Sequence, residues 1–430
     1  MKVYLGIILL ALVMMPATSF SQSQPDELTL LRQQVAALTE RLEKLEAASA
    51  SSQQVQAELK AQNRETVQVV RDMQGTIGEK VQESVKEEIS DQSWASRVSW
   101  KGDFRYRYEH IDQEGRSNRD RQRVRARPAL TAKVNDTVTV GFGLATGGSD
   151  PVSTNQTLGG GGSTKAANID LAYFDWKSAS GIKVSGGKFK NPLHRAGGNA
   201  LLWDGDWRPE GLVAKYDDKT WFGTLMGTFL ESDSRREDEL AIAAQLGYRT
   251  TVGDGMKLTA GLGYYSIGVQ GFAPIFDPED GFGNSLDDQG RYLFDYNEVE
   301  LFAELGFSLA ERPASLFFDY VKNTDADDFD SGWAIGGKYG KAGARGTWEM
   351  GYVYQDLEAD AVLGLVTDSD FAGGGTDGRG HKITAGYGLG KGWKLNLTYF
   401  ITETGGDAED RGEGTERDYD RLQLDIGFKY

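Results

Sequence analysis

The chain closes on Leu422-Gln423-Leu424-Asp425-Ile426-Gly427-Phe428-Lys429-Tyr430, in which apolar residues alternate with polar residues or glycine. Successive side chains of a β-strand point to opposite faces, so the alternation predicts a strand with one apolar and one polar face. Such a strand fits the wall of a membrane barrel, with its apolar face toward lipid and its polar face toward a watery lumen. A soluble β-sandwich could contain the same nine residues, so the rest of the chain has to decide.

The composition narrows the class of protein. Mean hydropathy is −0.47, and no later run of about 18 apolar residues supports a helical membrane protein. The 55 glycines against 9 prolines fit many strands joined by tight turns. There is no cysteine, which excludes a disulfide framework and a thiolate metal site, and we expect no cysteine-linked lipid anchor. The net charge of −17 argues against a nucleic-acid partner.

Residues 1–21 are predicted to be a signal peptide. Lys2 precedes a short apolar core at 3–15, and small residues follow near 19–21, which is the pattern of an export signal. The alternative, a membrane anchor helix, would need a longer apolar stretch. We therefore expect an exported protein.

Residues 27–90 are predicted to be a periplasmic coiled-coil segment. Apolar residues recur there at spacings of three and four, at Leu28, Leu31, Val35, Leu38, Leu42 and Leu45. This is the heptad seam of helices that wind around one another. The alternative is a lone amphipathic helix on the barrel or membrane, but a stripe this narrow needs a partner helix to bury it.

From residue 97 to 430 the hydrophobic pattern has a period of two. We predict an all-β transmembrane barrel of 16 antiparallel strands, within a range of 14–18. The predicted strands are 97–110, 119–134, 136–147, 167–178, 181–190, 206–217, 220–231, 239–251, 254–268, 295–309, 312–323, 331–339, 346–356, 379–389, 391–402 and 418–430.

The connections between these strands alternate in length. Those after even-numbered strands are tight, as at Asn135-Asp136, whereas those after odd-numbered strands are mostly long and polar, as at 148–166 and 269–294. Outer-membrane barrels have short periplasmic turns and long external loops. A secreted array of β-sandwiches would not produce this alternation. An even strand number also places both barrel ends, and hence the coiled coil, in the periplasm.

Three segments carry a resemblance to known families. Residues 121–127 and 141–158 are similar to the putative porins of Gram-negative bacteria, which have a coiled coil before the barrel, and residues 186–192 resemble phosphate-selective porins. The resemblance implies outer-membrane passage of small hydrophilic solutes, by a homotrimer. Tyr430 departs from the phenylalanine that most often ends such chains.

The predicted pore-lining residues form an arginine ladder on the first two strands, made of Arg105, Arg107, Arg119, Arg121, Arg123, Arg125 and Arg127. Aromatic residues alternate with the cations of the first strand and belong toward lipid, which turns the cations into the lumen. An arginine facing lipid at mid-bilayer would cost about 2–4 kcal/mol. Arginines lining a pore favour anions. Alternatively, Asp103 and Glu109 pair with many of these arginines, which would then serve as a scaffold.

The connection 191–205 is predicted to fold into the barrel as a constriction loop, because it contains four apolar residues in an otherwise polar set. The candidate constriction residues are Lys188, Lys190, His194, Arg195, Asp204 and Asp206. The alternative is a packed external cap. Acidic clusters such as 325–330 could bind Ca²⁺, but they lack the spacing of a calcium loop, so we predict no cofactor and no metal site.

The sequence thus predicts an outer-membrane porin that binds lipid and lipopolysaccharide and lets small solutes diffuse. No nucleophile motif or metal-ligand spacing supports an enzyme; the three histidines are far apart. A different class of function stays open, in which the barrel is only an outer-membrane anchor for a tether or adhesin with a periplasmic coiled coil.

Overall fold

A computed structural model describes residues 32–41, 43–44, 58–73, 94–232, 238–410 and 414–430. The chain divides into two compact units, Met1–Ser93 and Trp94–Tyr430. In the first unit the described residues are helical and exposed, and a coiled coil is not evident among them. The predicted signal peptide at 1–21 lies outside the described residues. No described helix is both long and apolar enough to cross a membrane.

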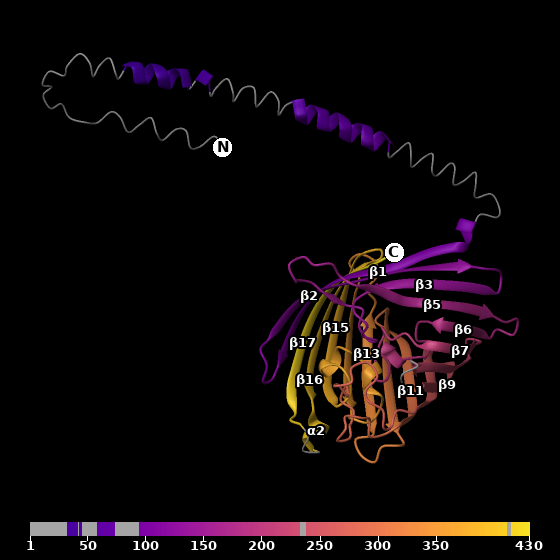
Figure 1. The fold of residues 1–430 in the computed structure, drawn as a ribbon. Coiled ribbons are helices and arrows are strands. Elements are labelled where there is room, and N and C mark those ends of the chain that lie inside the picture. The colour runs from indigo at the N-terminus through magenta and orange to yellow at the C-terminus, as the bar shows by residue number, and fades with distance from the viewer. Residues whose placement is uncertain (1–31, 42, 45–57, 74–93, 233–237, 411–413) are drawn as a thin grey trace. The chain divides into compact units, whose positions relative to one another are not determined.

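The second unit is a closed antiparallel barrel (Figure 1). Its described residues form one 17-stranded sheet, in which β4 (Gln156–Thr157) is only two residues long. The other strands make the 16-strand barrel, because β1 (Val98–Gln113) pairs with both β2 (Arg119–Lys133) and β17 (Arg417–Lys429). The predicted barrel of 16 antiparallel strands is therefore confirmed.

The remaining strands are β3 (Val138–Thr146), β5 (Ala167–Lys177), β6 (Lys183–Lys188), β7 (Glu210–Asp217), β8 (Trp221–Glu231), β9 (Glu239–Val252), β10 (Met256–Ile267), β11 (Tyr296–Leu309), β12 (Arg312–Asn323), β13 (Ser331–Gly340), β14 (Trp348–Leu357), β15 (Gly378–Gly390) and β16 (Trp393–Thr404). The described helices of this unit are η1 (Trp94–Arg97), η2 (Ala196–Gly198), η3 (Gly364–Val366), η4 (Phe371–Gly373) and α2 (Gly406–Asp410). Apart from β4, each strand lies where a strand was predicted.

The barrel closes where β17 meets β1. Arg107 stands opposite Asp425 in this pair, and Phe104 stands opposite Phe428. Leu424, Ile426 and Phe428 are exposed on the outer surface, as expected of side chains that face lipid. The alternation in the last nine residues thus sets which face of the closing strand is outside.

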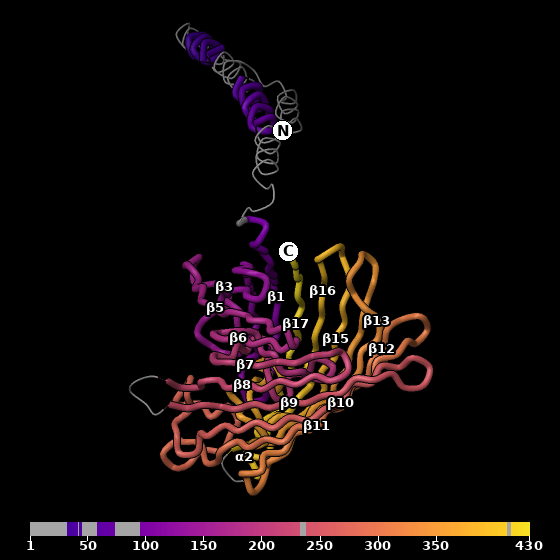
Figure 2. The backbone as a smooth tube through the Cα atoms, turned by 90° about the vertical axis from the view of Figure 1, so that its right-hand side faces the viewer, coloured from indigo at the N-terminus to yellow at the C-terminus, as the bar shows by residue number. Residues whose placement is uncertain are grey.

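The two ends of the barrel differ. The C-terminus lies at one end and α2, in the connection between β16 and β17, lies at the other (Figures 1 and 2). Tight turns join β2 to β3 and β7 to β8, where Val134 N donates to Val138 O at 2.9 Å and Asp218 N donates to Trp221 O at 3.1 Å. The short and long connections therefore alternate as predicted.

Two predicted strands are too long. β6 ends at Lys188 and β7 begins at Glu210, so residues 189–190 and 206–209 belong to the connection between them. These residues leave the wall because the connection packs on buried groups inside the barrel, as described below. β4 was not predicted: it pairs with Arg123 and Val124 of β2 beyond the part of β2 that pairs with β3.

Candidate functional site

The arginine ladder lies on the inner face of two paired strands. Across β1 and β2 the register places Asp103 opposite Arg127, Arg105 opposite Arg125, Arg107 opposite Arg123 and Glu109 opposite Arg121. The alternate side chains Trp100, Phe104 and Tyr106 are exposed on the outside. Because neighbouring side chains point to opposite faces, three adjacent strands, β17, β1 and β2, present charged groups to the interior.

Two carboxylates of β1 pair with the ladder. Asp103 contacts Arg125 at 3.1 Å and Arg127 at 3.0 Å, while Glu109 contacts Arg421 at 2.5 Å, Arg123 at 3.6 Å and Arg121. Glu109 is fully buried, and a buried carboxylate needs such partners to offset its lost hydration. The structure therefore contains the pairing that the scaffold alternative assumed.

Two further carboxylates reach the ladder from loops. Asp206 contacts Arg127 at 2.6 Å and Arg125 at 3.4 Å, and Asp370 contacts Arg421 at 2.7 Å and Arg107 at 2.9 Å. Burial would raise the pKa of Asp206, but the guanidinium groups of Arg125 and Arg127 outweigh burial and lower this pKa to about 2. Burial is likewise outweighed at Asp370, whose pKa lies well below the ordinary carboxyl value because of Arg421 and Arg107. Both loop carboxylates are therefore charged at neutral pH.

Some donors of the ladder stay available. Arg119 makes no ion pair within the described part of the chain and is exposed. The Nε atoms of Arg105 and Arg123 are buried, and within the same described residues they have no hydrogen-bond partner. Arg105 contacts Asn155, and Arg123 donates to Ser153 Oγ at 3.5 Å. A guanidinium has five N–H donors, so these arginines can still bind an anion.

The connection between β6 and β7 crosses to the inner face of distant strands. Four hydrogen bonds fix it there: His194 N to Gln245 Oε1 at 2.7 Å, Gly197 N to Glu304 Oε2 at 2.9 Å, Asn199 Nδ2 to Asp319 Oδ2 at 2.7 Å, and Lys338 Nζ to Gly197 O at 2.6 Å. The acceptors and donors on the wall belong to β9, β11, β12 and β13. The loop is therefore tied to wall residues inside the barrel.

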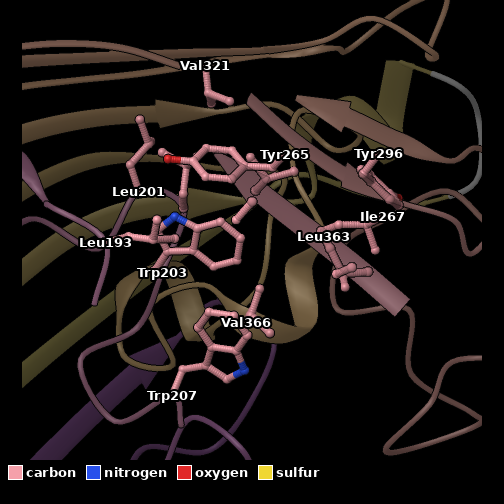
Figure 3. Packing of buried hydrophobic residues seen from close by; sticks show 14 of the residues in the cluster. Leu193, Leu201, Trp203, Trp207, Tyr265, Ile267, Tyr296, Val321, Leu363 and Val366 are labelled. Carbon is pink, nitrogen blue, oxygen red and sulfur yellow. The ribbon is translucent and has the colours of Figure 1, made fainter. Parts of the chain in front are cut away.

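Apolar side chains fill this half of the interior. Leu201 is fully buried, and Trp203 and Trp207 stack with ring centroids 4.8 Å apart. Figure 3 shows Tyr265 next to Trp203, and Val366 next to Trp207. The ladder strands contribute no residue to this cluster. The described interior thus has an apolar cluster against β7–β14 and a row of charged groups against β17, β1 and β2.

A second inward connection, at 358–377, was not predicted to enter the barrel. Leu363 and Val366 are buried in the apolar cluster, and Val366 O accepts a hydrogen bond from Asp204 N at 2.7 Å. Ser369 N donates to Asp204 Oδ2 at 3.2 Å. The signal that identified 191–205, apolar residues in a polar loop, is also present in 361–366 and would have identified this connection.

The six constriction candidates separate into two groups. Lys190 lines a cavity with Arg125 and Arg127, and Asp206 binds those arginines directly. The other four lie elsewhere. Lys188 pairs with Glu210 at 2.6 Å, and His194 packs between Phe222 and Phe302. Arg195 donates to Trp203 O at 3.0 Å, and Asp204 N donates to Val366 O of the second inward connection. Burial lowers the pKa of His194 and raises that of Asp204, where Asp368 and Asp206 add repulsion.

Sequence reasoning missed Asp370 and Arg421. Arg107 Nε and Nη2 donate to the two oxygens of Asp425 at 2.7 and 2.9 Å. Arg421 lies on the same face of β17 as Asp425, four residues earlier, so period-two counting could have identified it. Asp370 comes from a loop and no periodic pattern points to it.

The ladder borders two cavities. A cavity of about 470 Å³ is lined by Arg119, Arg121 and Arg123 together with Arg421 and Asp370. A cavity of about 800 Å³ is lined by Arg125 and Arg127 with Lys101, Lys190 and Asp425. Counted over the described lining residues, five arginines face two carboxylates in the first, and eight basic residues face three carboxylates in the second. Both spaces are therefore basic although the chain as a whole is acidic.

Metal ligation finds no support in the described residues, where no group of three histidine, aspartate or glutamate side chains could hold an ion. In the acidic cluster 325–330, Asp330 pairs with Lys322 at 2.8 Å, and Asp325 accepts a hydrogen bond from Asn297.

Several solved structures are similar to this chain. OprB of Pseudomonas putida matches with 13% identity and a TM-score of 0.54, over 78% of this chain and 95% of that one. A loop-deletion mutant of OmpT, an outer-membrane protein of Vibrio cholerae, has 13% identity and a TM-score of 0.47, over 77% of this chain and 99% of that one. OmpF of Salmonella typhi has 12% identity and a TM-score of 0.47, over 77% of this chain and 97% of that one. No curated protein matches the sequence.

A family model described as Putative porin matches residues 111–271 and 293–430. The match covers well over half of the chain and includes every residue of the arginine ladder except Arg105 and Arg107. Family and fold together indicate an outer-membrane channel rather than an enzyme. The chain belongs to the Putative porin family.

Proposed function

We propose that this porin passes small hydrophilic solutes along the arginine ladder and favours anions. The observation that carries the proposal is that one row of arginines borders both basic cavities, Arg119 to Arg123 the smaller and Arg125 to Arg127 the larger. Cations that line a pore raise the local concentration of anions and set charge selectivity. Because 186–192 resembles phosphate-selective porins, inorganic phosphate is the first anion to test.

The two inward connections would narrow the passage. Residues 189–209 and 358–377 pack against β7–β14, and the polar space beside the ladder stays open. Asp206 and Asp370 pair directly with arginines beside that space, so a solute would pass alongside these ion pairs. The narrowed passage would order polar solutes and exclude large ones.

The remaining features concern assembly and orientation. We propose that the turns face the periplasm and the long connections the outside, where they meet lipopolysaccharide. The segment 27–90 would then be periplasmic, and its heptad seam would join copies of the chain into a coiled coil within a homotrimer. Cross-linking the full chain and a variant lacking 27–90 tests whether this segment sets the oligomer.

Conductance in planar lipid bilayers tests the central proposal. The wild type should form open channels, and its reversal potential in a KCl gradient should indicate anion preference. The double variant Arg123→Glu plus Arg125→Glu should shift the reversal potential toward cation preference. The matched control Lys165→Glu plus Lys219→Glu makes the same change of charge at exposed positions and should not shift it.

An electrically closed barrel would overturn the proposed passage of solutes. It would favour the second candidate, an outer-membrane anchor for a tether or adhesin, which the apolar packing of half the interior supports. If the double variant forms open channels and its reversal potential equals that of the wild type, the ladder does not line the narrowest section of the pore.

A further inference from the structure

We infer that Arg107 and Arg421 form a binding site for a small oxyanion, a carboxylate or phosphate, and that Asp370 of the 358–377 loop occupies this site as a displaceable internal ligand. The inference rests on the proposed anion path for its solute class. It goes further by naming the site and its built-in competitor.

The two arginines converge on the loop carboxylate from the barrel wall. Arg107 Nη1 lies 2.9 Å from Asp370 Oδ2, and Arg421 Nη2 lies 2.7 Å from Asp370 Oδ1. Each oxygen of Asp370 therefore has its own guanidinium. A free carboxylate or phosphate offers the same pair of acceptor oxygens, and arginine forks match both groups.

The wall holds the two arginines without help from Asp370. Arg107 donates to both oxygens of Asp425, at 2.7 and 2.9 Å. Arg421 donates to Glu109 Oε2 from Nε at 3.1 Å and from Nη2 at 2.5 Å. Both arginines are almost fully buried, at 4% and 3% exposure. If Asp370 leaves, the site remains organised, and an organised site binds without a large ordering cost.

Asp370 differs from the other carboxylates of the site because it belongs to a loop. Asp425 and Glu109 are strand residues in the closed sheet, whereas Asp370 is held through its neighbours. Its own N–H donates to Asp368 Oδ1 at 3.0 Å, and Ser369 Oγ donates to Val152 O at 3.1 Å. Asp370 can therefore be exchanged without breaking the barrel.

The displaced side chain and the incoming anion both have space. Asp370 and Arg421 line the 470 Å³ cavity together with Arg119, Arg121 and Arg123. Arg119 is exposed and Arg421 is buried, so an anion that enters this cavity can meet Arg119 first and Arg421 next. Arg107 does not line the cavity and is reached when Asp370 moves away. The competition predicts that the wild type binds such anions weakly and releases them readily.

Calorimetry tests the inference. It measures the binding of inorganic phosphate, and separately of acetate, to the full-length protein in nanodiscs, and this measurement does not depend on whether the channel conducts. Asp370→Asn should bind phosphate about tenfold or more tightly than the wild type, because charge pairs in such sites couple by more than 1.4 kcal/mol. The matched control Asp150→Asn removes the other carboxylate of the same cavity and should leave the affinity within about twofold. Stronger gain with acetate than with phosphate would assign the site to carboxylates.

Equal phosphate affinity in the wild type and Asp370→Asn would overturn the inference, as would an equal gain in Asp150→Asn. If Asp370→Asn does not fold, Asp370→Ser serves in its place, and Asp370→Glu should keep the wild-type affinity. In bilayers, phosphate should block the chloride current of Asp370→Asn at a lower concentration than that of the wild type. A closed wild-type channel would refute the proposed passage but would leave the binding result decisive for the site.

Discussion

The side-chain amide of Asn199 donates a hydrogen bond to Asp319 Oδ2 at 2.7 Å and so ties the β6–β7 connection to β12 inside the barrel. Asp319 is almost fully buried, and its other oxygen has no hydrogen-bond partner among the described residues. A buried carboxylate with a free oxygen is costly, so this contact has to be held by the packing around it. The backbone of Gly197, two residues before Asn199, lies close against the ring of Phe317 on β12.

Gly197→Ala should loosen the β6–β7 connection. A Cβ atom at this position would lie 2.2 Å from Phe317 Cδ1, and the backbone φ of +59° is itself unfavourable for alanine. We expect a loss of about 1–3 kcal/mol of unfolding free energy from overpacking, together with a larger single-channel conductance. Urea unfolding of the refolded protein and bilayer recordings measure the two effects.

Gly198→Ala is the control for backbone strain. Its φ is +69°, but the nearest atom to an added Cβ is Lys338 Nζ at 3.7 Å. This variant should show only the strain that a non-glycine residue has in this region, and no change in conductance. Equal conductance in the two variants would contradict the role assigned to the contact between Gly197 and Phe317.

Gly102→Val should disturb barrel closure. Gly102 N donates to Tyr430 O at 2.9 Å, and Tyr430 N donates to Gly102 O at 3.1 Å. A Cβ on Gly102 would lie 2.6 Å from the Tyr430 ring, so the terminal ring must leave its place, at a cost of about 1–3 kcal/mol. The temperature at which the folded band converts to the unfolded band on a gel should fall.

Gly427→Val is the matched control for closure. It lies in the same strand pair, opposite Arg105, but the nearest atom to its Cβ is 4.0 Å away. Its conversion temperature should stay close to that of the wild type. A fall as large as that of Gly102→Val would mean that any side chain at this seam is harmful, whatever its contact with Tyr430.

Asp206→Asn should destabilise the protein at neutral pH. The pKa of Asp206 is lowered to about 2 from an ordinary 3.8, so its charge contributes stability that is present above the ordinary value and is lost as pH falls toward 2. The shift corresponds to about 2 kcal/mol. Urea unfolding should show this difference from the wild type at pH 7, and the difference should shrink between pH 4 and 2.

Asp204→Asn should behave in the opposite way. Burial, with repulsion from Asp368, raises the pKa of Asp204 well above 3.8, so the folded state holds this proton after the unfolded chain has released it. Stability contributed by the protonated form is therefore lost as pH rises through the raised pKa. The variant should match the wild type near pH 4 and become the more stable of the two at higher pH. A constant difference across this range would contradict the assignment.

The positions of the strands followed from local sequence. Each span alternates apolar and polar residues because one side of the wall meets lipid and the other meets the interior, and this constraint acts on every residue separately. The same rule oriented the closing strand. The predicted strands ran too far at residues 189–190 and 206–209, where the chain leaves the wall to pack inside, and β4 was missed.

The sequence by itself determined the barrel, its outer face and the inward row of arginines, because period-two alternation is a local property of the chain. Only the tertiary structure decided which carboxylates meet those arginines. Asp206 and Asp370 come from loops 79 or more residues away from the ladder groups they bind on β2 and β1, and loop side chains follow no period. Their positions depend on the packing of Trp203, Leu363 and Val366 in the apolar cluster, whose wall residues come from strands far apart in the sequence, β7 to β14.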